Sequence, residues 1–259
     1  MSAPSPVDGS CHAWRVGVAQ VVYADERIVV LSKPAGVSLA TRRAEPGAAV
    51  ARLLATVSPA DRDDHCLAAE LLQLVHRLDV GTSGLVLLAR DGDAHRALVT
   101  ALSTRLVAKT YLALVWGHPH PAAGRFEWPL GPDRSDRRRM RVDVAGRSAV
   151  TGFAVVGRAP HVALLRLEPL TGRTHQLRVH LAHAGHPVVG DDLYGGPRHH
   201  GVRDPRRRAV LDPGHTFLHA WRLHLPETAA SPELILHAPL PDDLSAALSV
   251  LGIPGSIPD

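Results

Sequence analysis

The chain contains few cysteines and no long apolar segment. Cys11 and Cys66 are its only cysteines in 259 residues, so neither a disulfide scaffold nor a thiolate metal site is expected, and a reducing compartment fits best. No apolar run reaches the roughly 18 residues of a membrane span, and residues 1–10 lack the basic start and apolar block of a secretion signal. The sequence therefore predicts a cytoplasmic protein with no membrane association.

Lysine is also scarce, because only Lys33 and Lys109 among the 29 basic residues are lysines. We hypothesise that these two positions require a compact ammonium group. The arginines crowd into residues 134–141 and 198–208 of a chain with formal charge +4. Guanidinium groups suit phosphate oxygens, so both stretches are typical of RNA-binding surfaces, although solvated loops would show the same pattern. If the second stretch binds RNA, neutralising Arg206, Arg207 and Arg208 weakens binding and flattens its salt dependence.

Strand patterns outnumber helix patterns along the chain. Apolar and β-branched runs predict strands at 20–23, 28–32, 85–89, 111–116, 124–130, 149–156, 162–168, 217–225 and 234–237. Helices are predicted at 46–57, 65–74, 94–106 and 174–184, with Asp93 as N-cap of the third and Gly185 after the last. The predicted fold is α+β, a mixed, largely antiparallel β-sheet core with flanking helices. It forms one domain at 19–259 behind a flexible leader at 1–18.

The first candidate site is His76-Arg77-Leu78-Asp79, which precedes a glycine-rich turn and the predicted strand at 85–89. Turns at strand ends are where a scaffold presents reactive groups, and a neighbouring arginine keeps a carboxylate ionised. An ordinary turn with an Arg–Asp pair would show the same local pattern. A serine hydrolase is rejected, because Leu85 stands where a nucleophile elbow needs its second glycine.

Two further segments carry polar groups. Lys109-Thr110-Tyr111 opens a strand on which residues 109 and 111 share a face, so an ammonium and a phenol could meet a phosphate and a base. Residues 171–180 lead into a helix whose N-terminus attracts anions. In isolation, the first segment would be a strand edge and the second a capped amphipathic helix. The histidines near this helix raise a metal-dependent hydrolase as a rival, but no H-E-x-x-H or C-x-x-C spacing supports a metal site.

Taken together, these segments resemble the RluA-type family of RNA pseudouridine synthases. The first site, followed by Thr82-Ser83-Gly84-Leu85, is similar to the family's catalytic motif, and Lys109-Thr110-Tyr111 is similar to its second motif. Thr171 to His180, continuing through Gly185, Pro187, Gly190, Asp191 and Tyr194, is similar to the third. Ancillary matches include Lys33-Pro34-Ala35-Gly36, and the resemblance runs in order from about residue 20 to residue 242.

This resemblance implies a mixed sheet with a central RNA-binding cleft, a cofactor-free and metal-free isomerase, and ribosomal or transfer RNA as substrate. It implies that Asp79 is the catalytic carboxylate, that Tyr111 packs against the target base, and that Arg178 pairs with Asp79. Base flipping would present the uridine, with Arg77 replacing it in the stack. The expected RNA-binding residues are His76, Arg77, Lys33, Lys109, Arg173, His175, Gln176, Arg206, Arg207 and Arg208.

Several alternatives remain open from the sequence. An RNA-binding protein or RNA chaperone on the same scaffold would differ from the enzyme in not depending on Asp79. The carboxylate could add covalently to the uracil or the sugar, or remove a sugar proton. The small RNA-binding module that some relatives carry before the catalytic domain is expected to be absent. We expect a monomer with no obligatory protein partner.

Overall fold

The structure is a computed structural model that describes residues 17–41, 45 and 47–255. The predicted leader at 1–18 lies almost wholly outside the described residues, as does Cys11. The strands are β1 (Gln20–Ala24), β2 (Ile28–Lys33), β3 (Gln73–Leu74), β4 (Ser83–Ala89), β5 (Ala108–Trp116), β6 (Ala123–Phe126), β7 (Leu130–Pro132), β8 (Met140–Val142), β9 (Thr151–Ala159), β10 (Val162–Pro169), β11 (Leu218–Leu225) and β12 (Leu234–His237).

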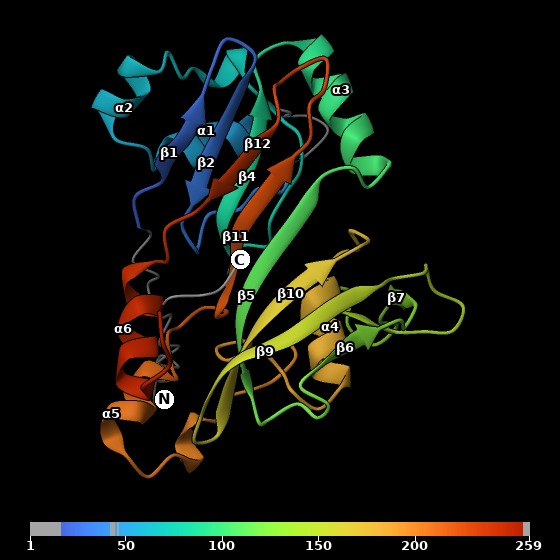
Figure 1. Cartoon of the computed structure of the whole chain (residues 1–259), viewed down its shortest axis with the longest axis vertical. Helices are drawn as coiled ribbons and strands as arrows, with labels where there is room; N and C mark the ends of the chain where they lie inside the picture. The colour runs from blue at the N-terminus through green and yellow to red at the C-terminus, as the bar shows by residue number, and fades with distance from the viewer. Residues whose placement is uncertain (1–16, 42–44, 46, 256–259) are drawn as a thin grey trace, which may run out of the picture.

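Six α-helices and two short 3-10 helices accompany these strands in the part of the chain that the structure describes. They are α1 (Ala48–Leu54), α2 (Pro59–Asp64), η1 (Ala69–Leu71), α3 (Gly92–Ser103), α4 (Gln176–His183), η2 (His199–Gly201), α5 (Pro205–Val210) and α6 (Asp242–Leu251). Ten strands form one twisted sheet with the main order β1-β2-β4-β11-β5-β10-β9-β6, while β7 and β8 form a separate hairpin (Figure 1). Every pairing is antiparallel except that of β4 with β11, which confirms the predicted α+β fold with a largely antiparallel sheet.

The neighbouring strands β2 and β4 carry continuous apolar runs, at 28–31 and 85–89, because both faces of the sheet are covered there. On β2, Val29 and Leu31 enter the core that α1 helps to form, whereas Ile28 and Val30 enter the core beneath α3. A strand buried on both faces loses the alternation of polar and apolar residues that marks a half-exposed strand. The hairpin of β1 and β2 and the buried strand β4 both confirm the sequence predictions.

Some local predictions were wrong. Residues 65–74 do not form a helix but contain η1 and β3, because Gln73 and Leu74 pair with β4 instead. The N-cap of α3 is Asp91 rather than Asp93, since the Asp91 side chain accepts a hydrogen bond from Ala94 N–H at 2.7 Å. The predicted strand at 124–130 is divided into β6 and the start of β7.

The parallel pairing of β4 with β11 brings the halves of the sheet together beside the first motif. Gly84 of β4 pairs with Ala220 of β11, and a Cβ on Gly84 would lie only 2.3 Å from the Ala220 carbonyl oxygen. Its φ of 107° also belongs to the region that favours glycine. The motif glycine is therefore required by a close approach of two backbones, which places the preceding loop over the centre of the sheet.

Candidate active site

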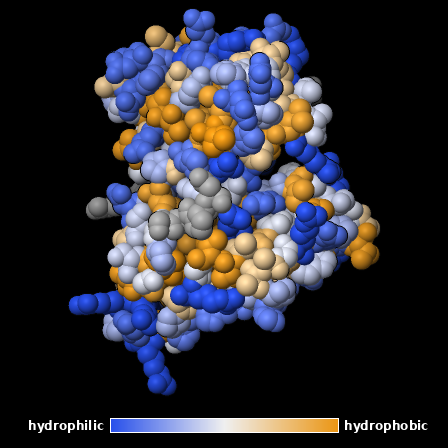
Figure 2. Space-filling view, in the orientation of Figure 1, coloured by the Kyte–Doolittle hydropathy of each residue, from blue (hydrophilic) through white to orange (hydrophobic). Residues whose placement is uncertain are grey.

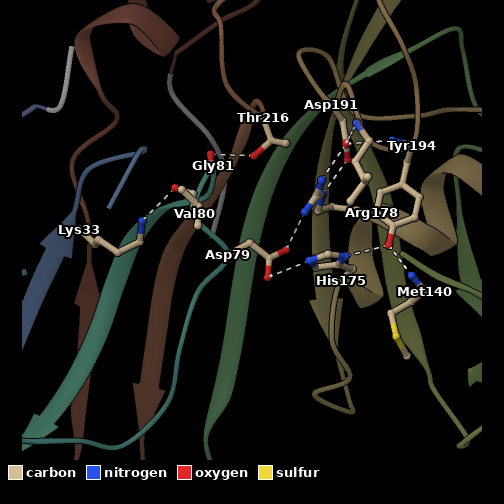
Figure 3. A network of polar contacts seen from close by, with 11 residues as sticks. Lys33, Asp79, Val80, Gly81, Met140, His175, Arg178, Asp191, Tyr194 and Thr216 are labelled. Carbon is tan, nitrogen blue, oxygen red and sulfur yellow. Dashed lines mark hydrogen bonds and ion pairs between the residues drawn. The ribbon is translucent and has the colours of Figure 1, made fainter. Parts of the chain in front are cut away.

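The turn that precedes β4 places Asp79 in the wall of a pocket of about 380 Å³. The pocket is lined by segments 38–40, 77–81, 190–193 and 214–216, together with Arg138, His175 and Arg178. The turn is closed by a hydrogen bond from Thr82 N–H to the Asp79 carbonyl at 3.1 Å. The Asp79 carboxylate faces α4 and remains 26% exposed (Figure 3). This volume lies within the roughly 300–1,000 Å³ of typical ligand pockets.

Arg178 on α4 links two carboxylates. Its Nη1 donates to Asp79 Oδ2 at 3.2 Å, while its Nε and Nη2 each donate to Asp191 at 2.8 Å. The Asp191 side chain is fully buried and also accepts from the backbone N–H groups of Leu193 and Tyr194. Asp191 therefore fixes the guanidinium plane, and the remaining N–H edge of Arg178 is aimed at Asp79.

The charge of this arrangement is well defined. Burial by itself lowers the pKa of Arg178, but the hydrogen bonds and charges of Asp191 and Asp79 outweigh it and raise the pKa above its ordinary value. The Arg178 guanidinium also stacks over the Tyr194 ring at 5.1 Å from its centroid. A permanent cation therefore stands beside the Asp79 carboxylate.

His175 approaches Asp79 from the start of α4. Its Nε2 is 3.9 Å from Asp79 Oδ1, and its Nδ1 is 2.8 Å from the Tyr194 hydroxyl, which also accepts a hydrogen bond from Met140 N–H. The phenol can donate its own hydrogen to Nδ1, and in that tautomer the imidazole hydrogen lies on Nε2, facing Asp79. Burial lowers the pKa of His175, and the charge of Asp79 opposes the effect.

Lys33 contacts the backbone of the loop that carries Asp79. The residue is completely buried, and its ammonium donates to the carbonyls of Pro34, Val37 and Val80 at 2.8, 3.1 and 3.4 Å. The Val80 carbonyl also accepts from Gly36 N–H at 2.8 Å. Burial lowers the pKa of Lys33 to about 7. We therefore reassign Lys33 from RNA contact to positioning of the loop that carries Asp79, because its nitrogen cannot reach a bound strand.

Gln176 is corrected in the same way. It is buried, its amide oxygen accepts from the Thr171 hydroxyl and Arg173 N–H, and its nitrogen donates to Val150 O and the Thr151 hydroxyl. All four hydrogen bonds are 2.7–3.0 Å long, and the two to Val150 and Thr151 tie the third motif to the start of β9. With its polar atoms occupied, Gln176 has a structural role rather than the predicted RNA contact.

The remaining predicted residues lie at different depths. His76 Nε2 accepts from Leu87 N–H at 3.2 Å, and burial lowers the pKa of His76 to about 3, so it is a neutral structural group. Tyr111 on β5 is buried; burial raises its pKa, and the charge of Asp79 adds to this effect. Burial lowers the pKa of Lys109, as it does for Lys33, the other lysine of the chain.

Five more of the predicted RNA-contact residues keep access to solvent. Arg77 is exposed and lines the mouth of the pocket. Arg173 is half-buried, and its Nε donates to Ser148 O at 3.0 Å. The arginines at 206–208 lie on α5, where the middle one is half-buried and its neighbours are exposed. None of the three on α5 lines the pocket around Asp79.

Sequence reasoning did not single out Asp191, Tyr194 and Arg138 as site residues. The first two appear in the third motif, but nothing local shows that one fixes Arg178 and the other contacts His175. Arg138 belongs to the first arginine-rich stretch and reaches the pocket from the loop between β7 and β8. An alignment of relatives would have been the signal for all three.

Two of the described histidines near α4 contact other polar groups. His180 contacts the Thr151 hydroxyl at 2.9 Å and Trp128 O at 3.0 Å, and His175 contacts Tyr194. Among residues 17–41, 45 and 47–255, no group of three or more His, Cys, Asp or Glu side chains is arranged to hold a metal ion. In the same residues, no helix is both long enough and apolar enough to cross a membrane.

The fold and the site define a protein in which one carboxylate, paired with a fixed arginine, faces a pocket with a basic rim. The chain matches the family model described as RNA pseudouridylate synthase over residues 27–183. It is 39% identical to an uncharacterized RNA pseudouridine synthase of Chloroflexus aurantiacus, over 85% of this chain and 65% of that protein. It is 36% identical to ribosomal large subunit pseudouridine synthase D of Neisseria meningitidis, over 89% of this chain and 60% of that protein.

A solved structure shows the same architecture. Human RNA pseudouridylate synthase domain containing 1 superposes with a TM-score of 0.70 at 25% identity, over all of this chain and 94% of that one. This chain therefore belongs to the RNA pseudouridylate synthase family. It spans 65% and 60% of the length of the two relatives named above, which are longer proteins.

Proposed function

We propose that this protein isomerises uridine to pseudouridine in RNA, with Asp79 as the catalytic carboxylate. Family membership supports the reaction class. The observation that carries the assignment to Asp79 is its 3.2 Å contact with Arg178, whose orientation Asp191 fixes independently. A pocket with a partly exposed carboxylate in its wall suits a reaction that starts by attack or proton removal.

The reaction breaks the bond between N1 of uracil and C1′ of the ribose, turns the base, and forms a bond between C5 and C1′. N1 gains a proton and C5 loses one, so the process needs no oxidant or reductant. Asp79 can add to the uracil or the sugar and leave again, or it can remove and return a sugar proton. In each route Arg178 stabilises the carboxylate when it is released.

Tyr111 and His175 provide the groups next to the carboxylate. Tyr111 is a neutral phenol at neutral pH, as an ordinary tyrosine is, and burial raises its pKa further; it would offer the uracil a flat face and a hydrogen-bond donor. His175 presents an N–H to the side of Asp79 opposite Arg178 and positions it, with Tyr194 holding the imidazole. Arg77 at the pocket mouth can occupy the place that the flipped nucleotide leaves.

We further propose large-subunit ribosomal RNA as the substrate, because the Neisseria meningitidis relative is named for that RNA. Transfer RNA is the alternative to test beside it. We also expect a monomeric catalytic domain at 19–259, acting in the cytoplasm. The described cysteine, Cys66, is a free thiol, which suits a reducing compartment.

Tritium release from RNA labelled at uracil C5 tests the proposal, with ribosomal and transfer RNA from cells that lack this activity. We expect the wild-type protein to release tritium from ribosomal RNA and Asp79→Asn to release none while still binding it. Asp93→Asn serves as the matched control, since Asp93 forms an exposed ion pair with Arg96 on α3. Tight binding without release by wild type would instead identify an RNA-binding protein or chaperone.

A further inference from the structure

A strongly basic segment leaves the active-site pocket and returns to it. The chain departs after Leu193 and comes back at Gly214, and both residues line the pocket. Between them, residues 198–208 contain five arginines and one aspartate, a net charge of +4. The formal charge of the whole chain is also +4, so all other residues together balance to zero. Within that remainder, residues 134–141 also hold five arginines and one aspartate, so the segment at 198–208 is one of two strongly basic stretches of the chain.

This segment borders a second cavity. The cavity has a volume of about 490 Å³ and is lined by His161, Gly201, Val202, Arg203, Asp204 and Arg207. His161 comes from the turn between β9 and β10, which lies beside α5 at the lower end of the molecule (Figure 1). Figure 2 shows strongly hydrophilic side chains projecting from the same lower end. Two guanidinium groups and an imidazole therefore converge on one hollow.

The two acids near this cavity already have partners, and for Asp204 one of them is Arg207 itself. Asp204 caps α5 by accepting from the backbone N–H groups of Arg206 and Arg207, and it lies 3.7 Å from the Arg207 guanidinium. Asp212 pairs with His199 at 3.6 Å. One capping carboxylate beside two guanidinium groups leaves a net positive charge in the cavity, which suits an anionic ligand.

We propose that this cavity is a second RNA site, in which Arg203 and Arg207 bind phosphates of the strand that flanks the target uridine. The inference rests on the proposed function for the nature of the ligand. One segment of chain, residues 193–214, contributes to both cavities, with its two ends at the uridine pocket and its middle at the second cavity. Arginine forks bind phosphate oxygens through paired N–H groups, and such phosphate contacts carry no sequence information. The site therefore selects for RNA length and shape.

The test compares Arg203→Gln/Arg207→Gln with wild type in binding a long ribosomal RNA fragment between about 50 and 200 mM salt. Removing one arginine–phosphate interaction lowers the slope of log affinity against log salt by about 0.7–0.9. Removing two such interactions lowers the slope by about twice this amount. Between 50 and 200 mM salt, the affinity of the variant should therefore fall by a factor about 10-fold smaller than the factor by which the affinity of wild type falls. The Lys/Lys double variant keeps the charge and should keep the slope.

Arg96→Gln is the matched control, because Arg96, like Arg207, pairs with an aspartate three residues earlier in a helix. It lies on α3 at the opposite end of the molecule, and its slope should equal that of wild type. In turnover assays, the Gln/Gln variant should raise KM for the long fragment about 10-fold at low salt. It should leave kcat, and KM for a short oligonucleotide around the uridine, unchanged.

An unchanged slope and KM in a folded Gln/Gln variant would overturn the second site, and so would an equal decrease in slope for Arg96→Gln. A decrease in slope that the Lys/Lys variant shares would also overturn it, since positive charge would not then be the cause. Failure of the proposed function gives a different result. Wild type would then form no pseudouridine, whereas the salt slope, measured by binding alone, would still report whether this cavity contacts RNA.

Discussion

Replacing Asp191 by asparagine probes how the active-site arginine is held. The side chain of Asp191 is fully buried and that of Arg178 is only 10% exposed, so their two 2.8 Å hydrogen bonds are shielded from water. Asparagine keeps the shape, but it removes the charge and turns one acceptor into a donor that faces a guanidinium N–H. Removal of one partner from a buried ion pair costs about 3–5 kcal/mol. Because Asp79 still neutralises Arg178 in part, we expect about 3 kcal/mol.

The same substitution should impair catalysis beyond its effect on folding. With Asp191 neutral, Arg178 turns toward Asp79 as its remaining carboxylate, and the geometry of the proposed catalytic group shifts. A displacement of about 1 Å can cost about 100-fold in rate, so kcat in the tritium-release assay should fall by about that factor. The KM for RNA should change little, because Asp191 is buried.

Denaturant unfolding and the activity assay check this together, with Asp93→Asn as the control. The pair of Asp93 with Arg96 is exposed, and exposed pairs contribute about 0–1 kcal/mol. The free energy of unfolding of the control should lie within about 1 kcal/mol of the wild-type value. If that of Asp191→Asn does too, the buried pair does not stabilise the fold as argued. If it is destabilised but keeps full kcat, Asp191 stabilises the domain without positioning Arg178.

Further predictions concern the backbone crossing, the buried lysine and a buried histidine. Gly84→Ala should lower the free energy of unfolding, measured with denaturant, by at least about 2 kcal/mol. Gly172→Ala should be near neutral, because a Cβ at that position meets no atom within 4 Å. Equal effects of the two substitutions would contradict the close approach at Gly84. Lys33→Arg should lower the free energy of unfolding by about 1–3 kcal/mol, because it overpacks a buried site, and it should also lower kcat. Lys109→Arg should have a smaller effect on both quantities. Full activity of Lys33→Arg would refute the positioning role of Lys33. Burial lowers the pKa of His219 to about 4, so the unfolded chain binds more protons than the native chain between about pH 6.5 and 4. Stability should therefore fall as pH falls through that window, and less steeply in His219→Asn; parallel pH curves for the two proteins would show that His219 is not the cause.

Local sequence patterns predicted the elements that depend on neighbouring residues. The β1–β2 hairpin follows from two β-branched runs with a polar turn, and the end of α4 from Gly185, whose φ of 86° fits a glycine cap. Local patterns gave wrong predictions where contacts with residues far along the chain determine the secondary structure. Residues 65–74 favour a helix locally, yet pairing with β4 makes part of them a strand. The short helix α5 and the terminal helix α6 were not predicted.

The site shows the same division. The order of the motifs, through family resemblance, named Asp79 and Arg178, and the structure brings these residues, 99 positions apart, to 3.2 Å. Burial could not be derived from the motifs. Lys33 and Gln176 are polar residues within motifs and were predicted to contact RNA, but their hydrogen-bonding atoms are occupied inside the protein.

The sequence by itself determined the family, the α+β composition and the identity of the proposed catalytic carboxylate, because these depend on residue types in a fixed order. Only the tertiary structure decided that Asp191 orients Arg178, that Tyr194 holds His175, and that Arg203 and Arg207 share a hollow with His161. Such relations depend on which strands pair and which backbones cross, as at Gly84 and Ala220. Those contacts join segments far apart in the chain, and spacing along the sequence does not encode their distances.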